Sequence, residues 1–311
     1  MHRPKIGRAV VAFLLMTLAY IGLLLWVDRG RGLMSGFDRL YSVLPVLMGL
    51  SLLSYLVRYA RWHWLLARAG ATVPPVRGFV AYLCGFAFTA TPGKVGELLR
   101  VRYFQPMGVP PALVVSAFVY ERVFDLVVVL CIAAMAAARF NLLPVVVLFV
   151  ALVVAVVFVL ARYPHHLLRL ASYLQQRHLK RLARLTEVFA RGFAHTTVWL
   201  KPMDLLVSLT AGTLAWGLTS YAFVLLIEHL GINVPTLLAL SIYPVAMLAG
   251  AASMIPGGFG STEAVAVALL VGLGASLANG TLAAIGIRLA TLWFATLMGL
   301  GAMLGLEMSR R

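Results

Sequence analysis

Nine charged side chains lie within or beside long apolar stretches of this sequence, where an ionised group is costly. They are Lys94, Glu97, Arg100, Arg102, Glu121, Arg122, Asp125, Glu263 and Arg288. Inside a membrane, each such charge costs several kcal/mol unless it is paired or hydrated. Two uses are therefore open: the charges pair with one another and hold helices together, or they bind a charged ligand.

The spacing of these charges predicts particular pairs. Arg122 follows Glu97 by 25 residues, and Arg288 follows Glu263 by 25 residues. We predict the ion pairs Glu97–Arg122 and Glu263–Arg288, each joining a broken apolar segment to the span that follows it. A structural role for these pairs does not exclude a role in binding.

A second group of charges lies on one predicted helix. Glu121 and Asp125 are four residues apart and share a helical face, whereas Arg122 projects about 100° away. We therefore expect Asp125 to meet another cation, such as Arg100 or Arg102.

Two apolar stretches are interrupted by proline and glycine, near the charged residues. The breaks contain Pro92, Gly93 and Gly96 in the first stretch, and Pro256, Gly257, Gly258 and Gly260 in the second. Proline removes a backbone donor and glycine loosens the chain, so a continuous helix is not expected through either break. Unpaired backbone at membrane depth is tolerated only where protein or a water-filled cavity surrounds it. The alternative is that both breaks are ordinary loops between short helices.

The first break favours phosphate binding. Its glycines expose backbone N–H groups, and a helix beginning near Val95 would direct its positive end into the break. Lys94, Arg100 and Arg102 add cations. The second break has Ser261 beside a threonine but no cation, so it is the weaker phosphate site. An amphiphile with a phosphate headgroup and lipid tails would suit a groove between these segments.

Composition defines the elements that must position these residues. The chain has 311 residues, of which 62% are hydrophobic and 12% charged, with a mean hydropathy of +0.96. Roughly a quarter of an ordinary soluble chain is charged. Apolar runs long enough to cross about 30 Å of hydrocarbon recur throughout. The sequence therefore predicts an all-α, polytopic membrane protein, a single transmembrane domain over residues 1–311.

The apolar runs predict six full crossings and two re-entrant broken hairpins. The segments are 9–27, 40–57, 78–104, 112–137, 142–161, 204–229, 236–275 and 281–306, the hairpins being 78–104 and 236–275. Residues 58–77 are expected to be a cytoplasmic loop, with Tyr55, Tyr59, Trp62 and Trp64 forming an interfacial aromatic belt. Residues 162–201 are expected to form a basic amphipathic linker on the cytoplasmic membrane face.

The distribution of basic residues orients the chain. The net charge is +16, and the lysines and arginines lie between apolar spans, as the positive-inside rule and anionic headgroups require. This pattern argues against nucleic-acid binding and places both termini in the cytoplasm. It also gives the two hairpins opposite orientations, so that residues 40–137 and 204–306 form an inverted repeat. Such repeats with broken helices are typical of transporters with a site near the membrane midplane.

Three segments resemble a known family. Residues 91–100 (TPGKVGELLR), 121–125 (ERVFD) and 256–263 (PGGFGSTE) resemble signature segments of the lysylphosphatidylglycerol synthase transmembrane-region family, whose members are flippase-like. The resemblance implies movement of phospholipids or polyprenyl-phosphate-linked sugars across a bacterial-type cytoplasmic (inner) membrane. Carried over by position, it implies roles for Lys94, Glu97, Arg100, Glu121, Arg122, Asp125 and Glu263.

Three functions are open. The first is a lipid flippase, with membrane lipids as its partners. It would have no metal or other cofactor. Because the sequence contains no ATP-binding motif, transport would be passive or driven by an ion gradient. In the second case Glu97 or Glu263 would carry a proton. The second is a membrane enzyme that uses Glu121 and Asp125 as a carboxylate pair. The third is a non-catalytic partner of another lipid-modifying enzyme. Because the aminoacylating relatives carry a soluble transferase domain, we expect a separate protein to supply any such chemistry.

Overall fold

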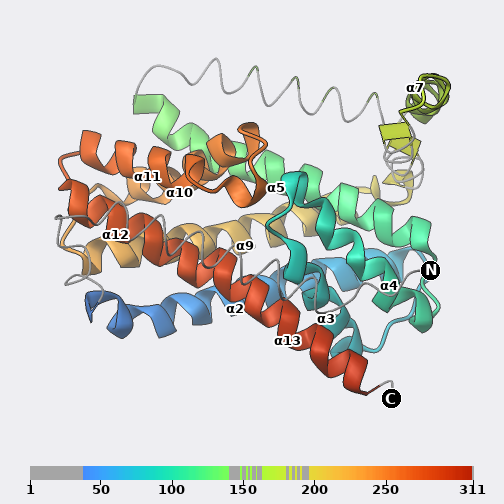
Figure 1. The fold of residues 1–311 in the computed structure, drawn as a ribbon, viewed down its shortest axis with the longest axis horizontal. Coiled ribbons are helices and arrows are strands. Elements are labelled where there is room, and N and C mark those ends of the chain that lie inside the picture. The colour runs from blue at the N-terminus through green and yellow to red at the C-terminus, as the bar shows by residue number, and fades with distance from the viewer. Residues whose placement is uncertain are drawn as a thin grey trace. The chain divides into compact units, whose positions relative to one another are not determined.

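The computed structural model describes residues 38–139, 163–179 and 196–309, and, in the gaps between these ranges, the single residues 148, 152, 155, 159, 182, 183, 186, 187 and 190. All regular secondary structure in these residues is helical (Figure 1). The described part holds three helices long and apolar enough to cross a membrane: Asp38–Arg68, Pro202–His229 and Leu277–Met308. The predicted all-α membrane bundle is confirmed.

The unbroken predicted spans correspond to long helices. Helix α5 covers Pro111–Arg139 and helix α9 covers Pro202–His229. The last span is formed by α12 (Leu277–Arg288), a π-helical turn η7 (Leu289–Trp293) and α13 (Phe294–Met308). The predicted span 9–27 and nearly all of 142–161 lie outside the described residues, so the number of crossings stays a prediction.

Helix α2 corrects the prediction of a loop at 58–77. It runs from Asp38 to Arg68 and ends at Gly70, which has φ +82° and lets the Ala71 N–H reach the Leu66 carbonyl at 3.0 Å. Tyr55, Tyr59 and Trp62 are buried, so the predicted aromatic belt is wrong for them. The apolar face of the helix continues past the arginines because their charges are neutralised inside the protein.

The first broken segment is a series of short helical pieces. In order they are α3 (Pro75–Cys84), η2 (Gly85–Phe88), η3 (Pro92–Leu99), α4 (Arg100–Phe104) and η4 (Gln105–Met107). The interruption between η2 and η3 confirms that no continuous helix runs through this segment. The predicted helix start near Val95 is wrong, because a 3₁₀ helix already covers that residue and the next α-helix begins at Arg100. The Thr91 hydroxyl accepts a hydrogen bond from the Gly96 N–H at 2.7 Å and supports the 3₁₀ turn.

The second broken segment is a pair of helices around a glycine turn. Helix α10 (Thr236–Ala252) and helix α11 (Ser261–Gly272) pack against each other, with the short turn η6 (Pro256–Gly258) between them. Gly257 and Gly258 both have φ +64°, a conformation that side chains with a Cβ rarely adopt. The predicted break is confirmed.

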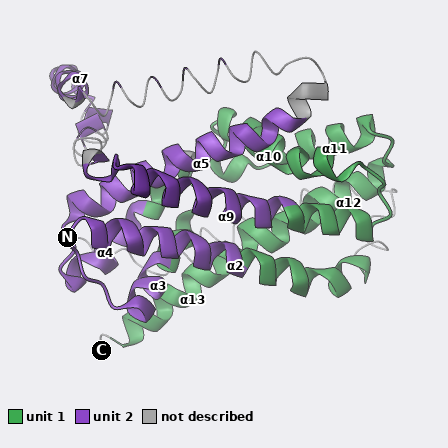
Figure 2. Cartoon of the chain, turned by 180° about the vertical axis from the view of Figure 1, so that it is seen from behind, with its two compact units in different colours: residues 1–51, 83–97, 221–311 green, residues 52–82, 98–220 purple. Residues whose placement is uncertain are grey.

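The chain folds as two compact units (Figure 2). Unit 1 comprises residues 1–51, 83–97 and 221–311, and unit 2 comprises 52–82 and 98–220. The core of unit 1 is built from α2, α9, α10 and α12 around Leu47, Phe223, Ile242 and Ile287. Unit 2 contains helix α7 (Pro164–Gln176), which forms part of the predicted amphipathic linker. These units do not coincide with the two predicted repeats, and the inverted repeat stays a prediction.

Candidate functional site

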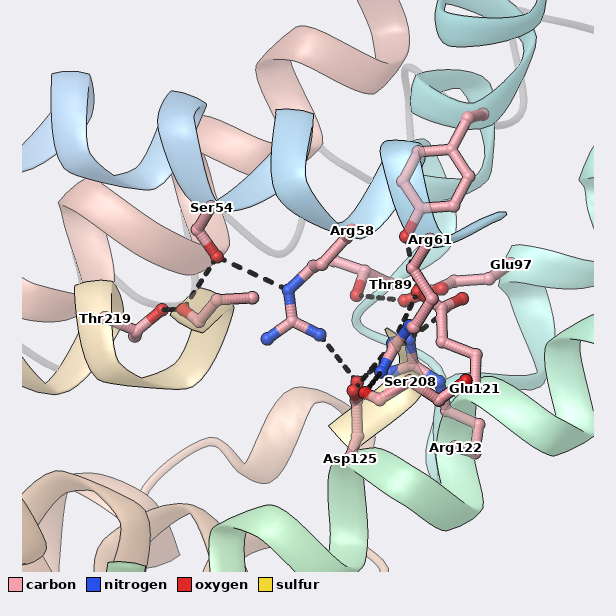
Figure 3. Close-up of polar contacts among 12 residues, drawn as sticks. Ser54, Arg58, Arg61, Thr89, Glu97, Glu121, Arg122, Asp125, Ser208 and Thr219 are labelled. Carbon is pink, nitrogen blue, oxygen red and sulfur yellow. Dashed lines mark hydrogen bonds and ion pairs between the residues drawn. The ribbon is translucent and has the colours of Figure 1, made fainter. Parts of the chain in front are cut away.

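Unit 2 contains a buried ionic cluster that joins α2 to α5 (Figure 3). Arg61 on α2 directs Nη2 to Glu121 Oε1 at 3.1 Å and to Asp125 Oδ1 at 2.8 Å, and these three side chains are 1%, 0% and 5% exposed. Arg58, one turn earlier, places Nη1 2.6 Å from Asp125 Oδ2. The spacing of three residues on α2 and four on α5 puts two charges on one face of each helix, so the two faces are complementary.

Glu121 is fully buried and has further partners. The Tyr82 hydroxyl donates to its Oε1 at 2.6 Å, and Arg100 Nη1 lies 3.3 Å from its Oε2. Arg100 Nε also donates to the Tyr82 carbonyl at 3.0 Å, and its guanidinium lies over the Tyr82 ring at 3.9 Å and the Trp62 ring at 5.1 Å. Aromatic faces attract a guanidinium and hold its plane, so these contacts fix the orientation of Arg100.

Arg122 also joins this cluster, contrary to prediction. Its Nη2 lies 3.4 Å from both Glu121 Oε2 and Asp125 Oδ2. The Cα–Cβ bond of Arg122 points away from their shared face, but a long flexible side chain can turn back along the helix. Its side chain is 21% exposed, the largest value in the cluster.

The predicted cation partners of Asp125 are also wrong. Asp125 contacts Arg58, Arg61 and Arg122, whereas Arg100 contacts Glu121. Arg102 lies with its guanidinium 5.8 Å from the Tyr103 ring centre. Sequence reasoning assigned Arg58 and Arg61 to a loop because they follow an apolar run. Arg58 and Arg61 are three residues apart, and Glu121 and Asp125 are four residues apart on α5, so each pair lies on one face of its helix. This complementary spacing was the signal that could have identified the two arginines as partners of the acids.

A second ionic contact lies in unit 1, at the glycine turn. Arg288 Nε donates to Glu263 Oε1 at 2.8 Å, which confirms the predicted pair. Arg288 Nη2 donates to the Gly257 carbonyl, and the guanidinium lies 5.4 Å from the Phe259 ring centre. One arginine from α12 thus holds both the turn and the first turn of α11, where the Ser261 hydroxyl donates to the Gly258 carbonyl at 3.1 Å.

The predicted site residues therefore separate into groups. Arg100, Glu121, Arg122 and Asp125 come together in unit 2, and Glu263 meets Arg288 in unit 1. Lys94 and Glu97 lie on η3 in unit 1, where Glu97 is 1% exposed and accepts a hydrogen bond from the Thr89 hydroxyl at 2.9 Å. The pair Glu97–Arg122 stays a prediction.

The unit 2 cluster is rich in arginine. Four arginines (Arg58, Arg61, Arg100 and Arg122) surround two carboxylates. Guanidinium groups recognise phosphate and carboxylate through paired N–H donors, and this is the chemistry that the cluster offers.

The chain matches a known membrane-protein family. The sequence profile of the family described as the lysylphosphatidylglycerol synthase TM region matches residues 8–299, which include both broken segments and both groups of ion pairs. Comparisons with characterised proteins and with solved structures find no match. The chain therefore belongs to the lysylphosphatidylglycerol synthase TM region family, a family of membrane proteins with lipid-related function.

Proposed function

We propose that this protein moves a phosphate-bearing amphiphile, a phospholipid or a polyprenyl-phosphate-linked glycan, across the membrane. The observation that supports the proposal is a buried, arginine-rich cluster on α2, α4 and α5 in which the Arg122 side chain remains 21% exposed. Removing a charge from water is costly, and a guanidinium inside an apolar bundle is stabilised further when an anion joins it. An anionic headgroup supplies that charge, and its acyl or prenyl chains remain compatible with the surrounding apolar surface.

The proposal involves no chemical step. What supports this part is that each carboxylate oxygen of Glu121 and Asp125 contacts at least one arginine. Because Glu121 and Asp125 are paired with arginines, we assign them a structural role that holds the arginines in place, and not the role of a general acid and base. If a lipid is modified, a separate lipid-modifying enzyme acts as the partner.

The proposal places the protein in the cytoplasmic (inner) membrane with both termini in the cytoplasm. What supports this orientation is the basic segment 163–179, in which Arg169 and Arg177 are exposed and no acidic residue is present. Basic segments favour the cytoplasmic side and the anionic headgroups there. Transport would be passive or coupled to an ion gradient.

Reconstitution in liposomes tests the proposal. Lipids that carry a fluorophore on the acyl or prenyl chain keep their phosphate, and a membrane-impermeant quencher reports how fast they cross. We expect transport well above protein-free vesicles, and a fall of about tenfold on Arg122→Gln, the loss expected for one charge-assisted contact. Arg77→Gln is the matched control, because Arg77 is an exposed arginine in the same unit.

Two outcomes contradict the proposal. If none of the labelled lipids crosses faster than in empty vesicles, the protein is not a lipid transporter. If transport occurs but Arg122→Gln leaves its rate unchanged in a folded protein, the arginine cluster does not handle the headgroup.

A further inference from the structure

Helix α7 lies in a basic part of the chain. Residues 163–201 include one acidic residue, Glu187. The described residues 163–179 contain no acid, and they carry five exposed histidine or arginine side chains: His165, His166, Arg169, Arg177 and His178. An exposed surface with one sign of charge attracts a partner of the opposite sign. A partner of this helix is therefore expected to be anionic.

One side of α7 is covered. Ala171 is 7% exposed, and Leu167 and Leu174 are partly buried. Residues three or four apart are neighbours on a helix, so these three side chains share one side. The side that a partner can meet is therefore a different one.

The exposed side of α7 combines apolar and basic groups. Its residues follow one another at spacings of three or four and form a stripe: Tyr163, His166, Leu170, Tyr173 and Arg177. Leu170 is 46% exposed and Tyr173 is 51% exposed. The Tyr163 ring centre lies 6.2 Å from that of His166. The Arg177 guanidinium lies 5.4 Å from the Tyr173 ring centre. These contacts extend the stripe to both ends of the helix, where Tyr163 is the N-cap and Arg177 the C-cap.

The composition of the stripe suits the headgroup region of a bilayer. Tyrosine is enriched at the membrane–water interface because its ring is apolar and its hydroxyl is polar. Arginine keeps its charge among headgroups while its stem covers apolar surface. A basic helix with exposed apolar groups lies in the plane of the interface, where anionic lipids attract it. An acidic soluble protein would also match the charge, but exposed tyrosine and leucine on a membrane-embedded chain favour the bilayer.

We infer that this stripe binds the headgroup region of a bilayer that contains anionic lipids, and that protonation of His166 strengthens the binding. The sequence predicts a basic amphipathic segment on the membrane face. The structure adds the side of the helix that meets the lipid, the class of lipid and a proton-sensitive contact. The inference does not depend on lipid transport, because surface binding by α7 involves none of the buried arginines.

His166 is the histidine of the stripe. Histidine gains a positive charge as the pH falls from about 8 to about 5, and anionic headgroups favour the charged form. Its titratable and charged neighbours on α7 are Tyr163, Arg169 and His165, whose ring centre is 4.1 Å away. None of the other described helices packs extensively against α7. His165 projects about 100° away from His166, outside the stripe. Desolvation, His166 and Arg169 lower the pKa of His165.

Spin labels on the intact protein in lipid nanodiscs test the inference. After Cys84 and Cys131 are replaced by alanine, a nitroxide is attached at Leu170→Cys on the stripe, or at Ser172→Cys, which is exposed about 200° round the helix. Collisions with oxygen, which concentrates in lipid, and with a neutral nickel chelate, which stays in water, give the ratio of docked to undocked helix. With phosphatidylglycerol added to phosphatidylcholine, we expect the label at residue 170 to enter lipid and the label at residue 172 to stay in water. In phosphatidylcholine alone, the docked fraction should fall.

Charge variants test the electrostatic part of the inference. Arg177→Gln should lower the ratio of docked to undocked helix about fivefold, the loss expected for one basic residue at an anionic surface. Arg177→Lys should restore the ratio, because the surface attracts charge rather than a planar fork. Arg77→Gln is the matched control, since it removes an exposed arginine elsewhere in unit 2 and should leave the ratio unchanged.

A pH series tests the role of His166. Lowering the pH from about 7.5 to about 5.5 should raise the docked ratio by up to about fivefold, because the histidine gains one charge. Phosphatidylglycerol keeps its charge over this range, so the change reports on the protein. His166→Gln should remove most of the rise, whereas the control His165→Gln should leave most of it.

Each contrary result has a distinct meaning. A label at residue 170 that stays in water in both bilayers overturns binding to the membrane, and equal immersion of both labels overturns the stripe. Equal docking with and without phosphatidylglycerol overturns the preference for anionic lipid. A pH response that survives His166→Gln overturns the role of that histidine. None of these results bears on the liposome assay of transport.

Discussion

Arg61 Nη2 lies 2.8 Å from Asp125 Oδ1, and this contact joins helices α2 and α5 across 64 residues of sequence. The side chains are 1% and 5% exposed, so the pair is shielded from water. Breaking a buried pair by removing one partner leaves an uncompensated charge, which is more costly than never having built the pair. The pair therefore stabilises unit 2 by holding α2 against α5.

The first prediction concerns the acid in this pair. Asp125→Asn keeps the shape of the side chain but leaves Arg58 and Arg61 without one of their negative charges. We expect the free energy of unfolding to fall by about 3–5 kcal/mol. Equilibrium unfolding in mixed detergent micelles, followed by circular dichroism, measures this change. Asp38→Asn is the control, because Asp38 is an exposed acid in the first turn of α2. Equal stability of the two variants would contradict the prediction.

The second prediction concerns Glu263 and Arg288. Since Arg288 contacts Glu263 and the Gly257 carbonyl, Arg288→Gln should destabilise the protein more than Glu263→Gln. The double variant should be less destabilised than the sum of the single changes, with a coupling energy of about 0.5–3 kcal/mol. Measuring the unfolding of the unmodified protein, the two single variants and the double variant in the same micelles completes this double-mutant cycle. Strictly additive effects would show that the two side chains do not interact.

The third prediction concerns close backbone packing on α13. A Cβ at Gly299 would lie 2.2 Å from the Ala87 backbone nitrogen on η2, whereas a Cβ at Gly301 meets nothing within 4 Å. Gly299→Ala should therefore cost about 1–3 kcal/mol, because backbone cannot move aside as a flexible side chain can. Gly301→Ala should be neutral or stabilise the helix by up to about 1 kcal/mol. Thermal unfolding of both variants measures the difference, and equal unfolding temperatures would refute the close contact.

The fourth prediction concerns Asp204, a buried acid that sequence reasoning did not select. Its Oδ1 accepts from Trp64 Nε1 and from Arg68 Nε, both at 3.0 Å, and it lies in the first turn of α9, where the helix dipole favours an acid. Asp204→Ala should cost about 2–3 kcal/mol, because it leaves the Trp64 indole donor without its acceptor.

Replacing Arg68, the ion-pair partner of Asp204, should have a small effect on the free energy of unfolding. The Arg68 side chain is 39% exposed, so Arg68→Ala should cost no more than about 1 kcal/mol. Denaturation in the same micelles gives the loss of stability for Asp204→Ala and for Arg68→Ala. Their ratio tests whether the buried acid, rather than its ion pair with Arg68, provides most of the stabilisation. A larger effect at Arg68 would reverse this assignment.

Several features of the fold follow from short stretches of sequence. The breaks at Pro92–Gly93 and Pro256–Gly257 were predictable because proline and glycine act on the backbone within a turn of their own position. The pair Glu263–Arg288 was predictable because a charge inside an apolar span requires a partner, and few opposite charges lie near enough in sequence. The composition alone was sufficient to predict a helical membrane bundle.

The residues that make up the buried ionic cluster of unit 2 could not be predicted in the same way. Arg58 and Arg61 follow an apolar run, which is also the pattern of residues flanking a membrane span. Whether such arginines face water or the protein interior depends on carboxylates 60 and 64 residues away in the sequence. Arg122 likewise reaches Glu121 and Asp125 by the path of its flexible side chain, which helical geometry at Cβ does not specify.

The sequence by itself determined that this protein is an all-helical membrane protein with two interrupted segments and a small set of charges within its apolar spans. Tertiary structure alone decided that Arg58, Arg61, Arg100 and Arg122 meet Glu121 and Asp125 in unit 2. The physical reason is range. Backbone breaks and apolar periodicity act over a few residues, whereas a buried charge is stabilised by partners that folding brings from distant parts of the chain.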